Sequence, residues 1–165
     1  MINPRTGATV FKSRLGILAI AGKRIVLRGP GRQFTLVNAA TDSERRLPWP
    51  SVLGWLDRPA VDPRGRYIAL TFADPAWGVP ARQAFDVWLL DTRKGTLKQL
   101  QGMPALVDLK RTSVVWTHDG RLVLLAQADG RKVVGVWRPG TGGLALKTVD
   151  FPDRTAGSDS FAPIS

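Results

Sequence analysis

Residues 62–70 read DPRGRYIAL, and the rest of the chain can be understood by working outward from this stretch. A short apolar segment leads into a turn that ends at Gly65, and a basic residue and a run of apolar, β-prone residues follow it. Glycine is favoured in such a turn because it adopts a positive φ without steric cost. The stretch therefore predicts two antiparallel strands joined at Gly65.

The same arrangement occurs three times. The turn glycines Gly22, Gly65 and Gly120 are 43 and 55 residues apart, and a basic residue follows each of them. The Asp-Gly pair at residues 119–120 is typical of a tight hairpin. A repeat of 43 to 55 residues that contains four strands is the sequence signature of a propeller blade.

A second strand pair follows each turn. Residues 36–47 align without a gap on residues 89–100, which places Asn38 on Asp91. The same alignment places Asp42 on Gly95, and a shift of 49 positions places Trp88 on Trp137.

The sequence therefore predicts an all-β chain, a partial β-propeller of about three four-stranded antiparallel blades. The expected organisation is an N-terminal extension (1–14), a repeat region of 15–149 with units at 15–50, 51–101 and 110–149, and a C-terminal tail (150–165). The expected strands are 16–21, 23–28, 33–38, 44–48, 56–61, 66–73, 84–91, 96–101, 112–117, 121–127, 132–138 and 144–149.

Several residues are expected to be structural. The residues interpreted as repeat turns are Gly22, Asp62, Gly65, Gly95, Asp119 and Gly120. We expect Asp62, Asp91 and Asp119 to accept hydrogen bonds from turn amides, as short polar side chains do in turns. Among the tryptophans, Trp88, Trp116 and Trp137 are expected in the core between blades, and Trp49, Trp55 and Trp77 outside the strand cores.

The pattern resembles the repeat of TolB-like, WD40-like β-propellers. Residues 62–70, 86–91 and 95–100 follow that repeat, and residues 116–121 are similar, with His118 in place of its proline. The chain from about residue 105 onward also looks like the C-terminal portion of propellers of an actinobacterial type. The resemblance implies a propeller fold, an extracytoplasmic location and work in protein complexes.

Three units are too few to close a ring, because closed propellers have about four to eight blades. The chain is then the C-terminal part of a longer propeller, a piece that assembles with other chains, or an open stack, and we favour the first. Open blade faces also predict self-association, because exposed apolar sheet surfaces pair with one another.

The charge favours acidic partners. The 165 residues contain 24 Lys and Arg against 13 Asp and Glu, a formal net charge of +11, and residues 1–50 alone hold nine basic and two acidic residues. Nucleic acid, an anionic surface and an acidic protein are all attracted to such a surface.

Catalysis has little support in the sequence. The chain has no Cys, and His118 is its one histidine, so cysteine nucleophiles and multi-histidine metal sites are excluded. No Gly-x-Ser-x-Gly elbow occurs. The sequence predicts that the protein is no enzyme and has neither a metal site nor a cofactor.

Three residues are candidates for partner binding: Trp77, Arg82 and His118. Trp77 and Arg82 fall in a long expected loop, and loops on a rigid sheet often carry binding residues. The alternatives are that Trp77 folds back on its own blade and that His118 is a solvated turn residue. The predicted function is a non-catalytic protein-binding or scaffold module, with a binder of nucleic acid or another polyanion, or a propeller accessory domain of a larger enzyme, as alternatives.

The N-terminal segment has two interpretations. Basic residues precede the apolar run 15–21, which ends in Ala-x-Ala as a signal peptide does. We favour a buried strand, because Gly22 then serves as the first repeat turn. No stretch is apolar for long enough to predict a transmembrane helix.

Overall fold

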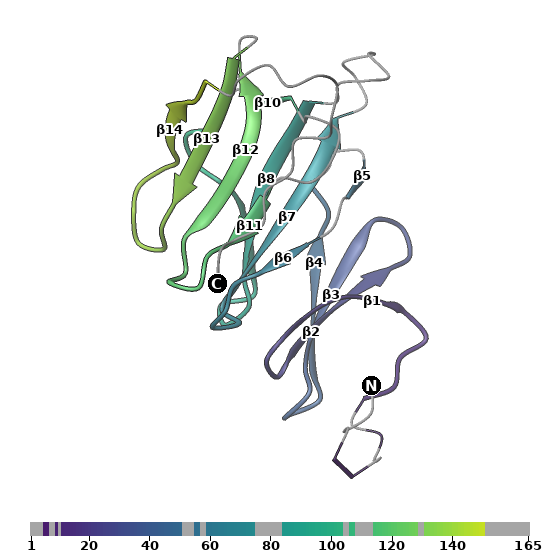
Figure 1. The fold of residues 1–165 in the computed structure, drawn as a ribbon. Helices are drawn as coiled ribbons and strands as arrows, with labels where there is room; N and C mark the ends of the chain where they lie inside the picture. The colour runs from purple at the N-terminus through teal and green to yellow at the C-terminus, as the bar shows by residue number, and fades with distance from the viewer. Residues whose placement is uncertain are drawn as a thin grey trace.

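The computed structural model describes residues 5–6, 9, 11–50, 55–56, 59–74, 84–103, 106–107, 114–128 and 131–150. The regular elements in these ranges are all β-strands (Figure 1). No helix within these ranges is long and apolar enough to cross a membrane.

The first unit is a four-stranded antiparallel sheet in the order β1-β2-β3-β4. Its strands are β1 (Gly16–Ala21), β2 (Arg24–Gly29), β3 (Gln33–Asn38) and β4 (Ser43–Pro48). The middle strands β2 and β3 carry most of its buried side chains, whereas β4 is exposed except at Leu47. The unit therefore has a covered centre and a solvated outer edge.

The second and third units repeat this antiparallel meander. The second consists of β6 (Ala60–Val61), β7 (Tyr67–Asp74), β8 (Ala84–Asp91) and β9 (Thr96–Gln99), and β5 (Trp55–Leu56) pairs with the far end of β7. The third consists of β11 (Val114–Trp116), β12 (Leu122–Ala128), β13 (Arg131–Trp137) and β14 (Ala145–Thr148). The prediction of an all-β partial propeller with about three four-stranded antiparallel blades is confirmed.

One short strand changes how these units are joined. β10 (Leu106–Val107) pairs with both β8 and β12, so the second and third units form one ten-stranded sheet. None of the expected strands includes these residues, because two apolar residues give no periodicity on which to place a strand. The first unit stays a separate sheet, below and to the right of the others in Figure 1.

Two apolar layers hold the units face to face. Between the first and second units, Phe34 and Trp49 stack with ring centroids 5.0 Å apart, and Phe72 meets Trp49 edge-on at 5.1 Å. Trp49 is only 8% exposed, so the expectation that it lies outside the core is wrong: it follows β4 directly and closes this layer.

The layer between the second and third units has its own aromatic group. Tyr67 stacks on Trp116 at 6.3 Å, and Trp137 meets Tyr67 edge-on at 5.7 Å. Trp116 and Trp137 are buried as expected, and Trp88 is partly buried against the other layer.

The strand register tests the sequence alignments. Arg24 pairs with Asn38 and Tyr67 pairs with Asp91, each two residues after its turn glycine, so the equivalence of Asn38 and Asp91 is confirmed. Asp42 and Gly95, also aligned, both have positive φ, 50° and 59°. In the third unit, however, the residue opposite Leu122 is Trp137.

The proposed equivalence of Trp88 and Trp137 is therefore wrong. Trp137 takes the place of Asp91, whereas Trp88 lies opposite Leu70, inside its strand pair. The distance in sequence from the turn glycine to the end of the second strand after it, β8 or β13, differs between the two units. A constant shift therefore aligns positions that are not equivalent.

Candidate functional site: an arginine-lined cavity at the turns

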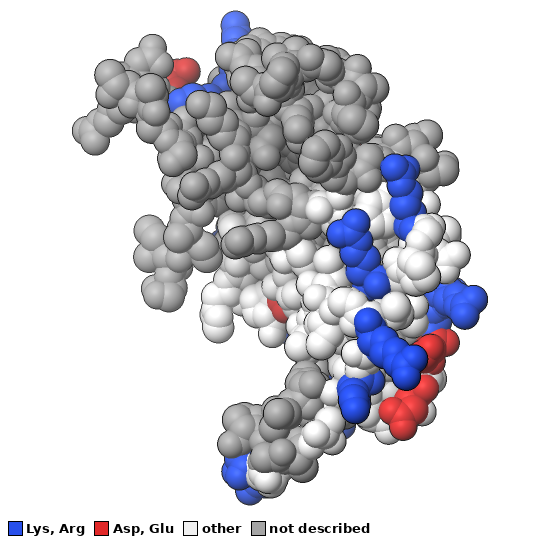
Figure 2. Space-filling model, turned by 90° about the vertical axis from the view of Figure 1, so that its right-hand side faces the viewer, with Lys and Arg blue, Asp and Glu red and all other residues white. Residues whose placement is uncertain are grey.

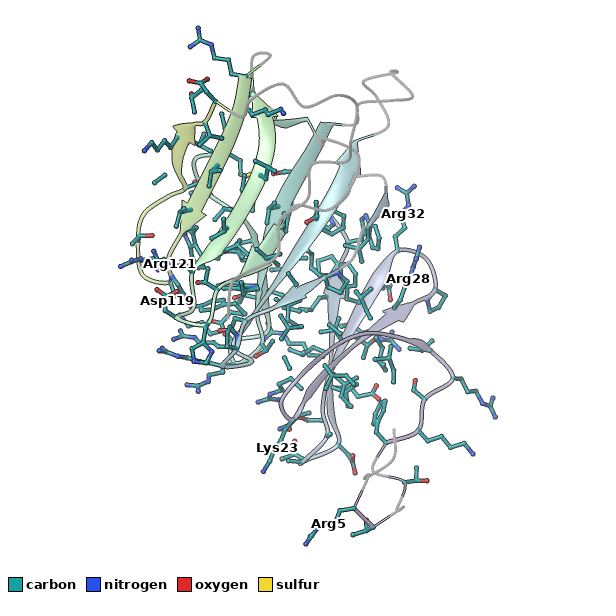
Figure 3. The ribbon with its side chains drawn as sticks, viewed as in Figure 1. Arg5, Lys23, Arg28, Arg32, Asp119 and Arg121 are labelled. Carbon is teal, nitrogen blue, oxygen red and sulfur yellow. The ribbon has the colours of Figure 1, made fainter. Side chains whose placement is uncertain are left out.

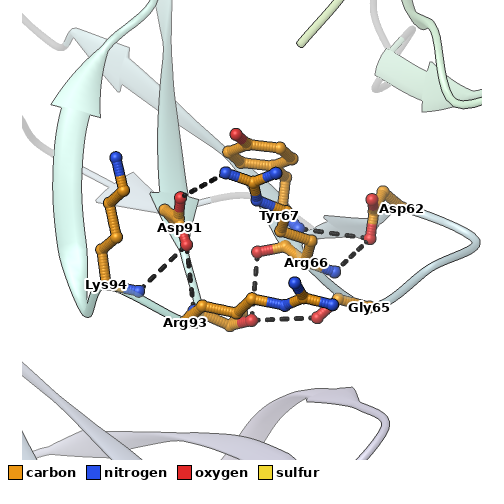
Figure 4. A network of polar contacts seen from close by, with 8 residues as sticks. Asp62, Gly65, Arg66, Tyr67, Asp91, Arg93 and Lys94 are labelled. Atoms are coloured by element: carbon orange, nitrogen blue, oxygen red, sulfur yellow. Dashed lines mark hydrogen bonds and ion pairs between the residues drawn. The ribbon is translucent and has the colours of Figure 1, made fainter. Parts of the chain in front are cut away.

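The turn between β6 and β7 is organised by a buried carboxylate (Figure 4). Asp62 is 6% exposed, and its Oδ1 accepts hydrogen bonds from the amides of Arg66 (2.6 Å) and Tyr67 (3.2 Å). Gly65 has a φ of 64° and donates its amide to the Asp62 carbonyl at 2.9 Å. Asp62 thus accepts hydrogen bonds from turn amides, as the sequence predicted. These bonds fix the backbone position from which the Arg66 side chain extends.

The turn between β8 and β9 is built in the same way. Asp91 Oδ1 accepts from the amides of Arg93 and Lys94, both at 3.0 Å, and Gly95 ends the turn with positive φ. This is the amide-binding role that the sequence predicted for Asp91.

A buried threonine joins these two turns. Thr92 is 1% exposed, and its hydroxyl lies 2.9 Å from the carbonyl oxygen of Gly65 and 3.0 Å from that of Arg66. Its amide also donates to the Arg66 carbonyl at 2.8 Å. Arg66 and Arg93 therefore extend from one hydrogen-bonded base.

The turn between β11 and β12 departs from the prediction. Thr117, at the place of Asp62, accepts the Arg121 amide on its hydroxyl at 3.0 Å. Asp119 instead accepts from the Thr117 hydroxyl and pairs with Arg121, so the expectation that Asp119 binds turn amides is wrong. The Asp119 side chain is exposed to solvent at the tip of the turn. The amide of Arg121 already donates to the Thr117 hydroxyl.

The Thr117 hydrogen bond and then the nearby guanidinium of Arg121 lower the pKa of Asp119 below its ordinary value of 3.8. Asp119 is therefore ionised at neutral pH, where Arg121 is also charged, so the ion pair persists there.

These turns surround a cavity of about 400 Å³ between the second and third units. Tyr67, Pro139 and two aspartates, Asp62 and Asp119, belong to its lining. The lining also includes five arginines from the two units: Arg64, Arg66, Arg93, Arg121 and Arg138. Asp119 and Arg121 lie at the turn end of the third unit in Figure 3, and they line the cavity together with residues of the second unit. Five guanidinium groups against two carboxylates give the lining of this cavity a positive charge, which suits an anion.

Two of the arginines are held in position. The Arg66 Nη2 lies 3.6 Å from Asp91 Oδ2, and its Cζ lies 4.9 Å from the centroid of the Tyr67 ring. The Arg121 Nε lies 2.7 Å from Asp119 Oδ2, an ion pair without the angle of a hydrogen bond. Each side chain stays about 40% exposed, at 40% and 41%.

Basic residues continue beside this cavity. A hollow of about 290 Å³ next to it includes Lys94 and Lys98, and one of about 150 Å³ between the first and second units includes Arg24, Arg45 and Arg93. Arg45 reaches across to the second unit, where its Nη1 donates to the Lys94 carbonyl at 2.8 Å. The turn end as a whole is therefore positively charged.

The structure places the predicted binding residues as follows. His118 is exposed in the β11–β12 turn, next to the cavity but not part of its lining. Trp77 and Arg82 lie outside the described residues. The sequence carried one signal of the arginine cavity, the basic residue after each turn glycine, but it did not show that Arg66 and Arg121 line one cavity between two units.

The described residues do not assemble a metal site: no three His, Asp or Glu side chains in these ranges lie close enough to hold an ion. The charged groups around the cavity are arginines and tethered aspartates, which suit binding of an anion. No protein family model and no curated protein matches the sequence.

Proposed function

We propose that this chain is a non-catalytic binding module that recognises an acidic protein through the arginine-lined cavity at its turns. The observation that supports the proposal is the convergence of five arginines, from two neighbouring units, on one cavity of about 400 Å³. Membership in the TolB-like, WD40-like propellers stays a prediction that rests on the repeat motif.

The scaffold suits this role. Asp62, Asp91 and Thr92 bind backbone groups of the turns, so the bases of the arginine side chains are ordered before a partner arrives. Preorganised groups cost less entropy when they bind. Arginine is also enriched among the residues that dominate the energy of protein interfaces.

A binder of nucleic acid is the second candidate, and the overall charge favours it. On the face shown in Figure 2, Lys and Arg side chains lie mainly along one side of the visible surface, and acidic side chains lie beside some of them and at other places. A nucleic-acid backbone is bound by basic groups that follow a track of phosphates. The strongest concentration of guanidinium groups is instead confined to one cavity, which favours a compact acidic group.

Binding measurements distinguish the two candidates. Fluorescence anisotropy of the full chain is measured with a labelled acidic peptide, a neutral peptide of equal length and a duplex DNA, at low and at physiological salt. We expect the acidic peptide to bind, and the double variant R66A/R121A to bind it at least about tenfold more weakly, the size expected for lost charge-assisted hydrogen bonds.

The matched control is R46A/R131A, which removes the same two charges from exposed positions outside the cavity. The control should leave peptide affinity within about twofold, because exposed charges away from a contact contribute little. Equal losses in both double variants, or DNA binding that is tighter and independent of Arg66 and Arg121, would contradict the proposal.

A further inference from the structure

We infer that the arginine-lined cavity binds a phosphorylated side chain of the partner, a phosphomonoester dianion. This inference rests on the proposed function and names the group that the cavity takes.

The first step is the charge that the cavity must neutralise. Five arginines and two aspartates line the cavity, and both aspartates already have partners within the protein. Asp62 is buried and accepts two amides on Oδ1, and Asp119 is paired with Arg121. The cavity therefore keeps an excess of positive charge. A single carboxylate of a partner cannot balance this excess.

The second step is which guanidinium nitrogens already contact an aspartate. Asp91 contacts Arg66 at Nη2, and the Arg66 Nε is buried without a hydrogen-bond partner among the described residues. Asp119 contacts Arg121 at Nε, which leaves both Nη groups of Arg121 to a ligand. Two guanidinium forks are thus anchored at one corner, with several N–H donors still unused.

The third step matches these donors to a ligand. A phosphomonoester carries a charge of about −1.5 to −2 at neutral pH and three strong acceptor oxygens, whereas a carboxylate has one charge and two oxygens. Guanidinium forks bind phosphate oxygens in pairs, and clusters of arginines are the usual solution for phosphorylated segments. Several guanidinium groups around one centre fit a phosphate better than a carboxylate.

The fourth step is the size of the site. A cavity of about 400 Å³ falls in the range of sites that bury a small ligand, so it has room for the phosphate and its neighbouring residues. Tyr67 and Pro139 provide apolar wall next to the arginines, which suits a peptide segment. Nucleic-acid phosphates, in contrast, are spread along a backbone with one charge each.

The experiment compares three peptides of one acidic sequence that differ at a single position, as phosphoserine, serine or glutamate. Titration calorimetry with the full chain should show that the phosphoserine peptide binds about tenfold or more tightly than the other two. Inorganic phosphate should compete for the phosphoserine peptide more strongly than chloride of equal ionic strength.

Lysine variants keep the charge and remove the fork. R66K/R121K should lose most of the preference for phosphoserine and keep binding of the glutamate peptide, because lysine is a point charge without paired donors. The control R46K/R131K should retain the preference.

The outcomes separate this inference from the proposed function. If the three peptides bind equally and R66A/R121A still weakens all of them, the phosphate assignment is overturned and the acidic partner stands. If none of the peptides binds and duplex DNA does, both are overturned.

Discussion

Asp62 and Thr117 hold the same place in successive turns, and each accepts the amide of the arginine that lines the cavity, Arg66 or Arg121. Asp62 also accepts the amide of Tyr67, whereas the Thr117 hydroxyl lies 3.1 Å from the carbonyl oxygen of Arg121. The rigidity of the site is thus decided by one short side chain in each turn.

Asp62→Ala should destabilise the protein by about 1–3 kcal/mol, because it leaves two turn amides without their acceptor in a buried site. Asp62→Asn should cost less, since an oxygen remains in place. Urea unfolding measures the loss, and Asp119→Ala in the neighbouring turn, with its carboxylate in solvent, is the control and should change little. Equal losses at the two positions would contradict the assigned roles.

Asp86 gives the protein a pH dependence. Burial raises the pKa of Asp86 above its ordinary 3.8, against the hydrogen bonds donated by Trp88, the Val87 amide and Gln99. The folded state therefore binds a proton more readily than the unfolded state, and this group lowers stability as pH rises from 3.8 through its folded pKa.

Asp86→Asn removes this dependence. We expect the melting temperature of the variant, relative to the unmodified chain, to increase between about pH 4 and about pH 7. The remaining amide oxygen still accepts from Trp88 or Gln99, which lie 3.2 Å and 2.8 Å from Asp86 Oδ2. A constant difference across this range would show that the carboxyl titrates as in water.

At the scale of elements, turn residues position whole sheets. A Cβ at Gly65 would lie 3.1 Å from the carbonyl carbon of Ala21, because the β6–β7 turn packs on the β1–β2 turn of the first unit. Gly120 has a φ of 82° but open space around it. These two glycines share a backbone conformation and differ in what stands next to them.

Gly65→Ala should therefore cost more than Gly120→Ala. Both replacements place a side chain in the left-handed region, at about 1–2 kcal/mol, and only the first also pushes the first unit away from the second. Guanidinium unfolding of the two variants measures the difference. A larger loss for Gly120→Ala would mean that the contact of the two turns contributes nothing.

The sequence predicted the strands well and their partners less well. Strand ends agree to within one or two residues wherever a turn glycine marks them, as at Gly22 and Gly65, since that signal is local. The expected strand 56–61 is divided into β5 and β6, and β10 was missed, because each of these strands has two residues and depends on neighbouring strands. The cavity was missed for a related reason: Arg66 and Arg121 are 55 positions apart, and their approach depends on how two units pack.

At the scale of the whole molecule, the two ends of the stack differ. The outer side of the first unit is covered, because Phe11 and Leu15 pack on Ile25, Leu27 and Val37. The third unit presents Val123, Val134 and Val136, which are half-buried and belong to none of the core clusters of the described residues. Cross-strand pairing of Val123 with Val136 makes this surface continuous.

Self-association through the third unit should increase with salt, because salt screens repulsion between chains of net charge +11. Val123→Lys/Val136→Lys should reduce it by placing charge on the apolar surface, whereas Thr148→Lys, on an exposed position of β14, should not. Light scattering at increasing salt measures the mass. A monomer at every salt concentration would contradict this prediction.

The two-residue strand β10 has a consequence for how the chain opens. It ties β8 to β12, and the Leu144 amide also donates to the Gln101 carbonyl at 3.0 Å, so backbone hydrogen bonds run from the second unit into the third. Among the described residues no backbone hydrogen bond runs from the first unit into the second. Native-state hydrogen exchange should then reveal two cooperative units, with the amides of β2 and β3 exchanging at a lower opening free energy than those of β7, β8, β12 and β13. The arginine cavity lies wholly within the slower unit, and opening of the first sheet would reach it through the β6–β7 turn, which packs on the β1–β2 turn.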